Sequence, residues 1–229
     1  MIDLQYKKTG ISIQVGLSGY SFKVYDADGC TSSGWLAPER LFSSSQMQKR
    51  YDEVEISMFT HKFTLVPSQF HNPIDPRTIL EEVADVLFED NVETVAVPQF
   101  ASVLVYSDSV GGSLPRVISE MVMQTDGTKV RPLPEVWYML SVLEQIGEYN
   151  KIVASYMDGW LYLVIAQGRT LMLCNAFAAP DFTTAEYFLF LAMKKLQLNP
   201  EMSSVYFRTP LDGEEEMSLY RYFKSVEQI

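Results

Sequence analysis

The chain has 229 residues, and 47% of them are apolar, including 13 Phe and 13 Tyr, which is ample material for one large core or two smaller ones. Its 18 basic and 29 acidic side chains give a net charge of −11. A surface this acidic repels phosphate backbones and anionic lipid headgroups, so the composition predicts no role on nucleic acid and none on a membrane.

The cysteines and the apolar runs indicate a compartment. Cys30 and Cys174 lie far apart and match no zinc-binding or redox spacing, which is typical of free thiols in a reducing cytoplasm. The start of the chain lacks the apolar core of a signal peptide, and the runs WLYLVIA and YFLFLAM are too short to span a bilayer. The sequence therefore predicts a soluble, cytoplasmic protein.

The N-terminal part of the chain has mostly strand patterns. ISIQVGLSGYSFKVYDADG predicts two strands around a turn at residues 16–19, ending at the turn signal Asp28-Gly29. A long polar connection follows. DEVEISMFTHKFTLVP then alternates apolar and polar residues, which predicts two strands with a short turn at Thr60-His61.

The middle of the chain combines helices and strands. DPRTILEEVADVLFED predicts a helix over residues 75–90, with Asp75 as its N-cap and Pro76 at its first position. VETVAVP and ASVLVYS predict strands. Residues 111–133 are an irregular connection around a short helix in RVISEMVM, and LPEVWYMLSVLEQIGEYN predicts a further helix with one apolar face.

The C-terminal part returns to strands. KIVASYMDGWLYLVIAQGRTLMLCNAF predicts three strands with turns at Asp158-Gly159 and Gln167-Gly168. DFTTAEYFLFLAMKKLQLNP predicts a helix opened by a capping box of Thr183 and Glu186. SSVYFRTP predicts a short strand, and GEEEMSLYRYFKSVEQI a last helix with its glutamates at the positive end.

Both halves follow one plan: a hairpin, a third strand, a helix and a further strand. This plan predicts an α/β fold of duplicated βββαβ subdomains at residues 1–110 and 134–229, with 111–133 as the irregular connection. No residue-level repeat is visible, so a chance recurrence of the plan stays open as the alternative.

Three stretches in this order carry a resemblance that spans nearly the whole chain. They are LSGYSFKVYD after an apolar strand, FTLVP after the next hairpin, and NAF followed by AEYFLFLAMKKLQLNPE before a strand. Together they resemble an uncharacterised bacterial domain-of-unknown-function family with an actin-like ATPase fold. The resemblance implies two actin-like (ribonuclease H-like) subdomains facing each other across a cleft, where active members of the superfamily hold ATP and magnesium.

The resemblance also implies a first phosphate hairpin, with a turn like Asp-x-Gly-Thr. Its carboxylate holds the hydrated metal ion, its glycine lets the backbone approach closely, and its hydroxyl lies beside the phosphate. Aligned on the Tyr-Ser that follows, this chain has Val15 in place of the aspartate and keeps Gly16, Ser18 and Gly19 in the turn. We interpret the turn as a tight hairpin that has lost its metal ligand.

The second phosphate hairpin and the adenosine pocket are also altered. Asp158-Gly159 matches the second hairpin, but it is equally a common two-residue turn, and Trp160 puts a large ring where a phosphate would approach. Arg208-Thr209-Pro210 stands where the superfamily has a glycine pair. Trp160 is either packed in a core or exposed as an anchor for a partner. The residues expected on the cleft floor are Gly16, Leu17, Ser18, Asp158, Gly159 and Trp160.

No other catalytic signature stands out in the sequence. His61 and His71 have no second ligand at metal spacing, and no nucleophile elbow, Walker loop or Rossmann fingerprint occurs. The sequence predicts a non-catalytic binding or scaffold module with a degenerate nucleotide site, no catalytic residue, no cofactor, no metal and a protein partner that it does not identify. The alternative is a nucleotide-dependent ATPase or small-molecule kinase with an unorthodox site, which requires Asp26, Asp108 or Asp158 beside the turn 16–19.

Overall fold

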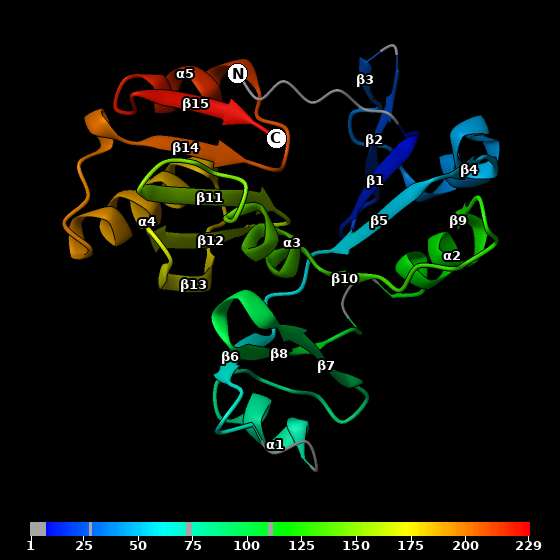
Figure 1. Cartoon of the computed structure of the whole chain (residues 1–229), viewed down its shortest axis with the longest axis horizontal. Helices are drawn as coiled ribbons and strands as arrows, with labels where there is room; N and C mark the ends of the chain where they lie inside the picture. Colours follow the sequence, from blue (N-terminus) through cyan, green and yellow to red (C-terminus); the bar gives the residue numbers. More distant parts are fainter. Residues whose placement is uncertain (1–7, 28, 72–74, 110–111) are drawn as a thin grey trace. The chain divides into compact units, whose positions relative to one another are not determined.

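The computed structural model describes residues 8–27, 29–71, 75–109 and 112–229 (Figure 1). The chain forms two compact units, each assembled from two stretches of sequence. The first unit contains Met1–Thr60 and Ser109–Glu135, and the second contains His61–Asp108 and Val136–Ile229. Two predictions fall partly outside the described residues. The absence of a signal peptide concerns residues 1–7, and the turn predicted at Asp28-Gly29 includes residue 28.

The first unit is built on a five-stranded sheet in the order β10-β5-β1-β2-β3. β1, β2 and β3 form an antiparallel meander, β5 lies parallel to β1, and β10 lies parallel to β5. The bounds of the strands are Gly10–Val15 (β1), Tyr20–Asp26 (β2), Gly29–Ser32 (β3), Glu53–Met58 (β5) and Leu133–Pro134 (β10). The unit also contains η1 (Pro38–Ser43), η2 (Ser45–Gln48), the paired strands β4 (Arg50–Tyr51) and β9 (Met123–Gln124), and helix α2 (Leu114–Met121).

The second unit is built on another five-stranded sheet, in the order β13-β12-β11-β14-β15. β11, β12 and β13 form an antiparallel meander, β14 lies parallel to β11, and β15 lies parallel to β14. The bounds of the strands are Asn150–Met157 (β11), Trp160–Gln167 (β12), Thr170–Ala178 (β13), Ser204–Phe207 (β14) and Ser225–Gln228 (β15). The helical segments are α3 (Glu135–Val142), α4 (Phe182–Lys195), η4 (Pro200–Met202) and α5 (Gly213–Tyr220).

The two sheets have the same strand topology, which agrees with the strands of the duplicated plan, whereas the helix predicted for the first half, α1, does not follow the third strand of the first sheet. In each, three antiparallel strands are followed by two strands that extend the sheet in parallel from the first strand. β1 therefore corresponds to β11, and the turn between β1 and β2 corresponds to the turn between β11 and β12. The connections differ: α4 joins the third and fourth strands of the second sheet, whereas only η1, η2 and β4 do so in the first.

A three-stranded sheet in the order β6-β8-β7 lies within the second unit. It comprises β6 (Phe63–Pro67), β7 (Val92–Val97) and β8 (Ser102–Ser107), with α1 (Pro76–Glu81) and η3 (Pro98–Phe100), and we call this group the small lobe. The turn predicted at Thr60-His61 therefore does not join neighbouring strands. Phe59 N–H donates to Val15 of the first sheet, whereas Ser107 N–H donates to Lys62 in the small lobe.

The two compact units do not coincide with the subdomains predicted from the sequence. Residues 61–108, expected within a first subdomain of residues 1–110, lie in the same unit as the C-terminal sheet, and residues 109–135 lie in the first unit. The ranges 1–110, 111–133 and 134–229 therefore remain a prediction about subdomains, and the compact units are discontinuous in sequence.

Three predicted helices end or begin differently. The helix predicted over residues 75–90 ends at Glu81, although Asp75 is its N-cap as expected. Helix α4 is capped by Asp181, whose carboxylate accepts from Thr184 N–H, so the capping box assigned to Thr183 is wrong. The last predicted helix stops at Tyr220, and the chain then forms β15, which pairs with β14.

Each five-stranded sheet has its own apolar core. In the first unit, Ile11, Ile13 and Ile56 are at most 1% exposed and pack with Ile118 of α2. In the second, the central strands β11 and β12 pack against α4 through residues such as Leu163. The continuous apolar runs of β11 and β12 thus reflect strands buried on both faces.

The cysteines and the helices bear on two further predictions. Cys30 and Cys174 are free thiols, and burial raises the pKa of Cys174 to about 12, so this thiol is protonated and unreactive at neutral pH. Within the part of the chain that the structure describes, no helix has both the length and the apolar character needed to cross a membrane.

Candidate functional site

The turn between β1 and β2 is the one that the sequence resemblance implies as the first phosphate hairpin. Val15 pairs with Tyr20 at the end of the hairpin, and Gly16 N–H donates to the Gly19 carbonyl at 3.0 Å, which closes the turn on itself. Leu17 at its tip is 62% exposed. The turn is therefore a tight, backbone-closed hairpin.

The small residues of this turn take part in internal packing. A Cβ atom on Gly19 would lie 2.1 Å from the carbonyl oxygen of Leu36, so the glycine is required by the approach of this neighbouring segment. Tyr20 and Leu36 exchange backbone hydrogen bonds of 2.9 and 2.7 Å, which hold the segment in place. The indole N–H of Trp35 donates to the Ser18 hydroxyl at 3.3 Å. The turn keeps two features of a phosphate loop, a glycine that lets backbone approach and a hydroxyl. Contacts with residues 35–36 account for both of them.

The carboxylate that would hold a metal ion is missing from this hairpin. Val15 at the end of β1 is 1% exposed and belongs to the core. Asp26 lies at the opposite end of β2, a strand whose seven residues span about 20 Å, and its carboxylate accepts from Gly29 N–H in the next turn. Asp26 therefore does not supply the missing ligand. Asp108 and Asp158 lie in the other compact unit.

The turn between β11 and β12 is a two-residue hairpin turn. Asp158 has φ 52° and Gly159 has φ 75°, and this pair of positive angles is the geometry that Asp-Gly favours. The Gly159 carbonyl accepts from Ala179 N–H at 2.7 Å, so the end of β13 covers the turn. The structure thus groups Asp158, Gly159 and Trp160 in one hairpin and Gly16, Ser18 and Gly19 in another.

Trp160 is half-buried and stacks on His61. The ring centroids lie 4.0 Å apart with an angle of 3° between the planes. Burial lowers the pKa of His61, the nearby charge of Lys62 lowers it further, and Asp90 opposes this in part. This contact could not be predicted from the sequence, because the two rings come from distant parts of the chain.

The chain after β14 is built into the fold where the superfamily has its glycine pair. Arg208 N–H donates to the Ala154 carbonyl at 3.0 Å, and the Thr209 hydroxyl accepts from Tyr156 N–H at 3.0 Å, so both residues extend the pairing with β11. The Arg208 guanidinium lies 5.5 Å from the centre of the Tyr138 ring. Thr209 is 1% exposed. Buried side chains thus fill this strand end.

The helix N-termini near this strand end are occupied by the protein's own carboxylates. Asp181 caps α4, and Asp212 caps α5 by accepting from Glu214 N–H and Glu215 N–H. Burial raises the pKa of Glu215, the hydrogen bond from Asp212 N–H lowers it, and the charges of Asp212 and Glu186 raise it again. The N–H groups of Thr184, Glu214 and Glu215, which could otherwise bind a phosphate, donate to these caps, and the surrounding charge is negative.

A buried polar pair lies beneath the first hairpin. The Gln14 amide donates to a carboxylate oxygen of Glu135 at 3.1 Å, and both side chains are buried. Gln14 was detectable in the sequence as a polar residue inside the apolar strand ISIQV, but its partner was not. Among the described residues, no group of three or more His, Cys, Asp or Glu side chains is arranged to hold a metal ion.

Comparisons with solved structures identify the fold. The chain is similar to a Bacteroides thetaiotaomicron VPI-5482 protein with an actin-like ATPase fold and unknown function, with 17% identity, a TM-score of 0.66, and coverage of 100% of this chain and 94% of that one. It is also similar to the cytoplasmic domain of Vibrio cholerae EpsL, an inner membrane component of the type II secretion system (14% identity, TM-score 0.50, coverage 89% and 83%). A third similar structure is a PilM-PilN type IV pilus biogenesis complex (11% identity, TM-score 0.50, coverage 96% and 88%).

The actin-like fold inferred from the sequence is thus confirmed by structures that share little sequence identity with the chain. No curated protein matches the sequence significantly. A family model described as a protein of unknown function (DUF3822) matches residues 3–226, so the chain belongs to this family.

Proposed function

We propose that this protein is a non-catalytic binding or scaffold module of actin-like fold, with a degenerate nucleotide site. The observation that carries the proposal is the first hairpin turn. Its glycine is required by the carbonyl of Leu36, its hydroxyl accepts from Trp35, and its strand ends in buried Val15 instead of a carboxylate. These internal contacts and the absence of a carboxylate at the end of the strand support a turn that no longer holds a phosphate with its metal ion.

Two further features of the second unit support the proposal. Thr209 and Arg208 fill the strand end where an adenine base would need open backbone. The N-terminus of α5 is satisfied by Asp212, and the adjacent Glu215 adds negative charge where a nucleotide would bring more. The filled strand end opposes binding of the adenine base. The altered first turn and the acidic start of α5 oppose binding of the phosphates.

The fold itself is compatible with a role in assemblies. One protein of similar fold is a component of the type II secretion system, and another occurs in the PilM-PilN type IV pilus biogenesis complex. At these identities the likeness extends to the fold, so we take from it only that an actin-like framework can serve as part of a larger complex.

Isothermal titration with ATP and magnesium tests the proposal. We expect no measurable heat of binding. A dissociation constant below about 100 μM, equivalent to roughly −5.5 kcal/mol, would overturn the proposal and favour the ATPase or kinase alternative. A thermal-shift assay checks the result independently, because about 1 mM ATP at that affinity would stabilise the protein by about 1.4 kcal/mol.

A further inference from the structure

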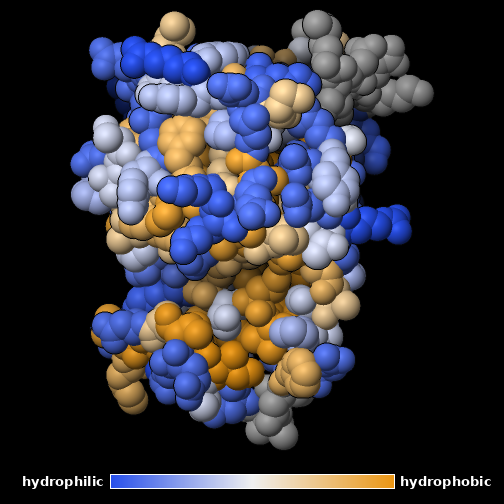
Figure 2. All heavy atoms as spheres, turned by 90° about the vertical axis from the view of Figure 1, so that its left-hand side faces the viewer, coloured by the Kyte–Doolittle hydropathy of each residue, from blue (hydrophilic) through white to orange (hydrophobic). Residues whose placement is uncertain are grey.

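The loop after α1, residues 82–91, exposes three large apolar side chains; we call it the Phe88 loop. Phe88 is 97% exposed, Val83 62% and Leu87 47%. Single apolar residues on a surface are ordinary, but here three fall within residues 83–88. Figure 2 shows apolar side chains gathered on the lower part of the molecule, where Figure 1 places the small lobe.

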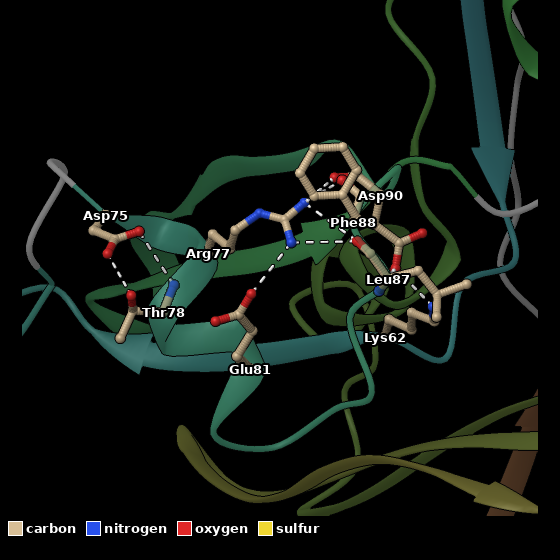
Figure 3. A network of polar contacts seen from close by, with 8 residues as sticks. All are labelled: Lys62, Asp75, Arg77, Thr78, Glu81, Leu87, Phe88 and Asp90. Atoms are coloured by element: carbon tan, nitrogen blue, oxygen red, sulfur yellow. Dashed lines mark hydrogen bonds and ion pairs between the residues drawn. The ribbon is translucent and has the colours of Figure 1, made fainter.

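The Phe88 loop is held from α1 by one arginine (Figure 3). The Arg77 guanidinium donates to the carbonyls of Leu87 (3.2 and 3.3 Å), Phe88 (3.2 Å) and Asp90 (2.6 Å). It also forms an ion pair with Glu81 at 3.2 Å. These bonds fix the backbone that carries Leu87 and Phe88 beyond the end of the helix.

A buried ion pair holds the same C-terminal part of the loop, at Asp90. The Lys62 ammonium lies 2.6 Å from the Asp90 carboxylate, and their side chains are only 13% and 6% exposed. The same carboxylate accepts from Leu87 N–H at 2.9 Å. Phe88 is thus presented on a backbone tied at both sides, so a partner would not have to order it, which favours binding.

The charge around the exposed side chains is negative. Glu82, Asp85 and Glu89 are exposed on the loop, whereas the basic residues that contact it, Lys62 and Arg77, are already engaged with Asp90 and Glu81. An apolar tip with an acidic rim is complementary to apolar side chains flanked by basic ones. A second copy of this chain, with net charge −11, would be repelled, as would nucleic acid.

Building on the proposed binding function, we propose that the Phe88 loop docks a segment of a partner protein in which apolar side chains are flanked by Lys or Arg. Phe88 and Leu87 would supply the apolar contacts. The carboxylates of Glu82, Asp85 and Glu89 would set the charge preference of the surface and speed association.

Fluorescence anisotropy with a labelled amphipathic peptide of leucine and lysine tests this inference on the full chain. We expect binding that weakens about tenfold in Phe88→Ser, since truncating an anchor at an interface has an effect of this size. The matched control is Phe42→Ser, which removes a 68% exposed ring from η1 in the other unit and should leave binding unchanged. Both exchanges alter exposed side chains, so both variants should keep the wild-type melting temperature.

Two further variants distinguish the contribution of the acidic side chains of the Phe88 loop from that of the Arg77 bonds that hold its backbone. The triple variant Glu82→Gln, Asp85→Asn, Glu89→Gln should weaken binding and reduce its dependence on salt. Arg77→Lys keeps the charge but removes the planar donor fork, so it should weaken binding without removing any apolar side chain of the loop.

Three results would overturn the docking inference: no binding of the leucine–lysine peptide, equal binding to Phe88→Ser, or equal binding of a peptide with serine in place of leucine. ATP titration of the same sample separates the two proposals. Nucleotide binding with intact peptide docking would contradict only the degenerate site, and loss of docking without nucleotide binding would contradict only the Phe88 loop.

Discussion

The imidazole of His61 lies flat against the indole of Trp160, with ring centroids 4.0 Å apart. His61 precedes β6 of the small lobe, and Trp160 begins β12 of the five-stranded sheet. A second tryptophan also contacts the small lobe, through a hydrogen bond: the indole N–H of Trp137 donates to the Ala96 carbonyl of β7 at 3.1 Å. Two tryptophans thus connect the small lobe to the rest of the second unit.

The stack predicts a structural role for Trp160. Trp160→Ala should lower the free energy of unfolding by about 2 kcal/mol, because it removes a half-buried ring and an aromatic pair. Thermal or urea unfolding measures this change, and His61→Phe, which keeps an aromatic pair, serves as the control with a smaller effect. Unchanged stability would contradict the structural role and leave Trp160 as an anchor for a partner.

His61 also makes stability depend on pH. Because burial lowers its folded pKa below the usual 6.5, the unfolded chain takes up the proton first as the pH falls. Its contribution is therefore full above about pH 6.5 and is lost as the pH falls from there toward the folded pKa. We expect the melting temperature to fall less between pH 7.5 and pH 5 in His61→Phe than in the wild type. Equal falls in both proteins would show that His61 does not titrate in this range.

The strands of both meanders could be predicted because strands that are neighbours in sequence also pair in the sheets. Alternating apolar residues and the Asp158-Gly159 turn indicated the strands of both meanders. The pattern does not reveal which strands pair, so β5 and β6, neighbours in sequence, were assigned to one hairpin although they lie in different sheets. β15 was missed because its four residues become a strand only by pairing with β14.

The candidate site was predicted less completely, for a physical reason. The sequence indicated that Val15 replaces a carboxylate and that Arg208-Thr209 replaces a glycine pair. The segment Trp35–Leu36 packs against the first turn, and its approach depends on tertiary contacts that the sequence pattern does not reveal. The end of α1 shows the same limit, since the chain leaves the predicted helix after Glu81 and the carbonyls of Leu87 and Phe88 accept from Arg77, a contact that the sequence pattern does not reveal.

Breaking the buried ion pair of the small lobe should destabilise the protein. Burial alone would raise the pKa of Asp90, but hydrogen bonds from Lys62 and Leu87 N–H outweigh it and hold the pKa below its usual range. Asp90→Ala should lower the free energy of unfolding by about 3 kcal/mol, because it leaves the Lys62 ammonium buried without its partner. Chemical denaturation measures the loss.

Two controls distinguish the ion pair from a general effect of losing a carboxylate. Asp75→Ala removes only the N-cap of α1 and should reduce stability by about 1 kcal/mol. The double variant Lys62→Met, Asp90→Leu should recover much of the loss seen in Asp90→Ala, since it buries no unpaired charge. A single variant as stable as the wild type would contradict the role assigned to the pair.

Gly19 distinguishes a structural turn from a working phosphate loop. Its substitution by alanine places a Cβ atom 2.1 Å from the Leu36 carbonyl oxygen, so the segment 35–36 must move and lose its paired bonds to Tyr20. Gly19→Ala should therefore destabilise the protein by about 3 kcal/mol, as measured by urea unfolding. Gly213→Ala is the control: its Cβ meets nothing within 4 Å at the start of α5, and stability should stay the same or rise slightly. If Gly19→Ala folds with wild-type stability, the glycine is not kept for packing, and a ligand at the turn becomes the better explanation for it.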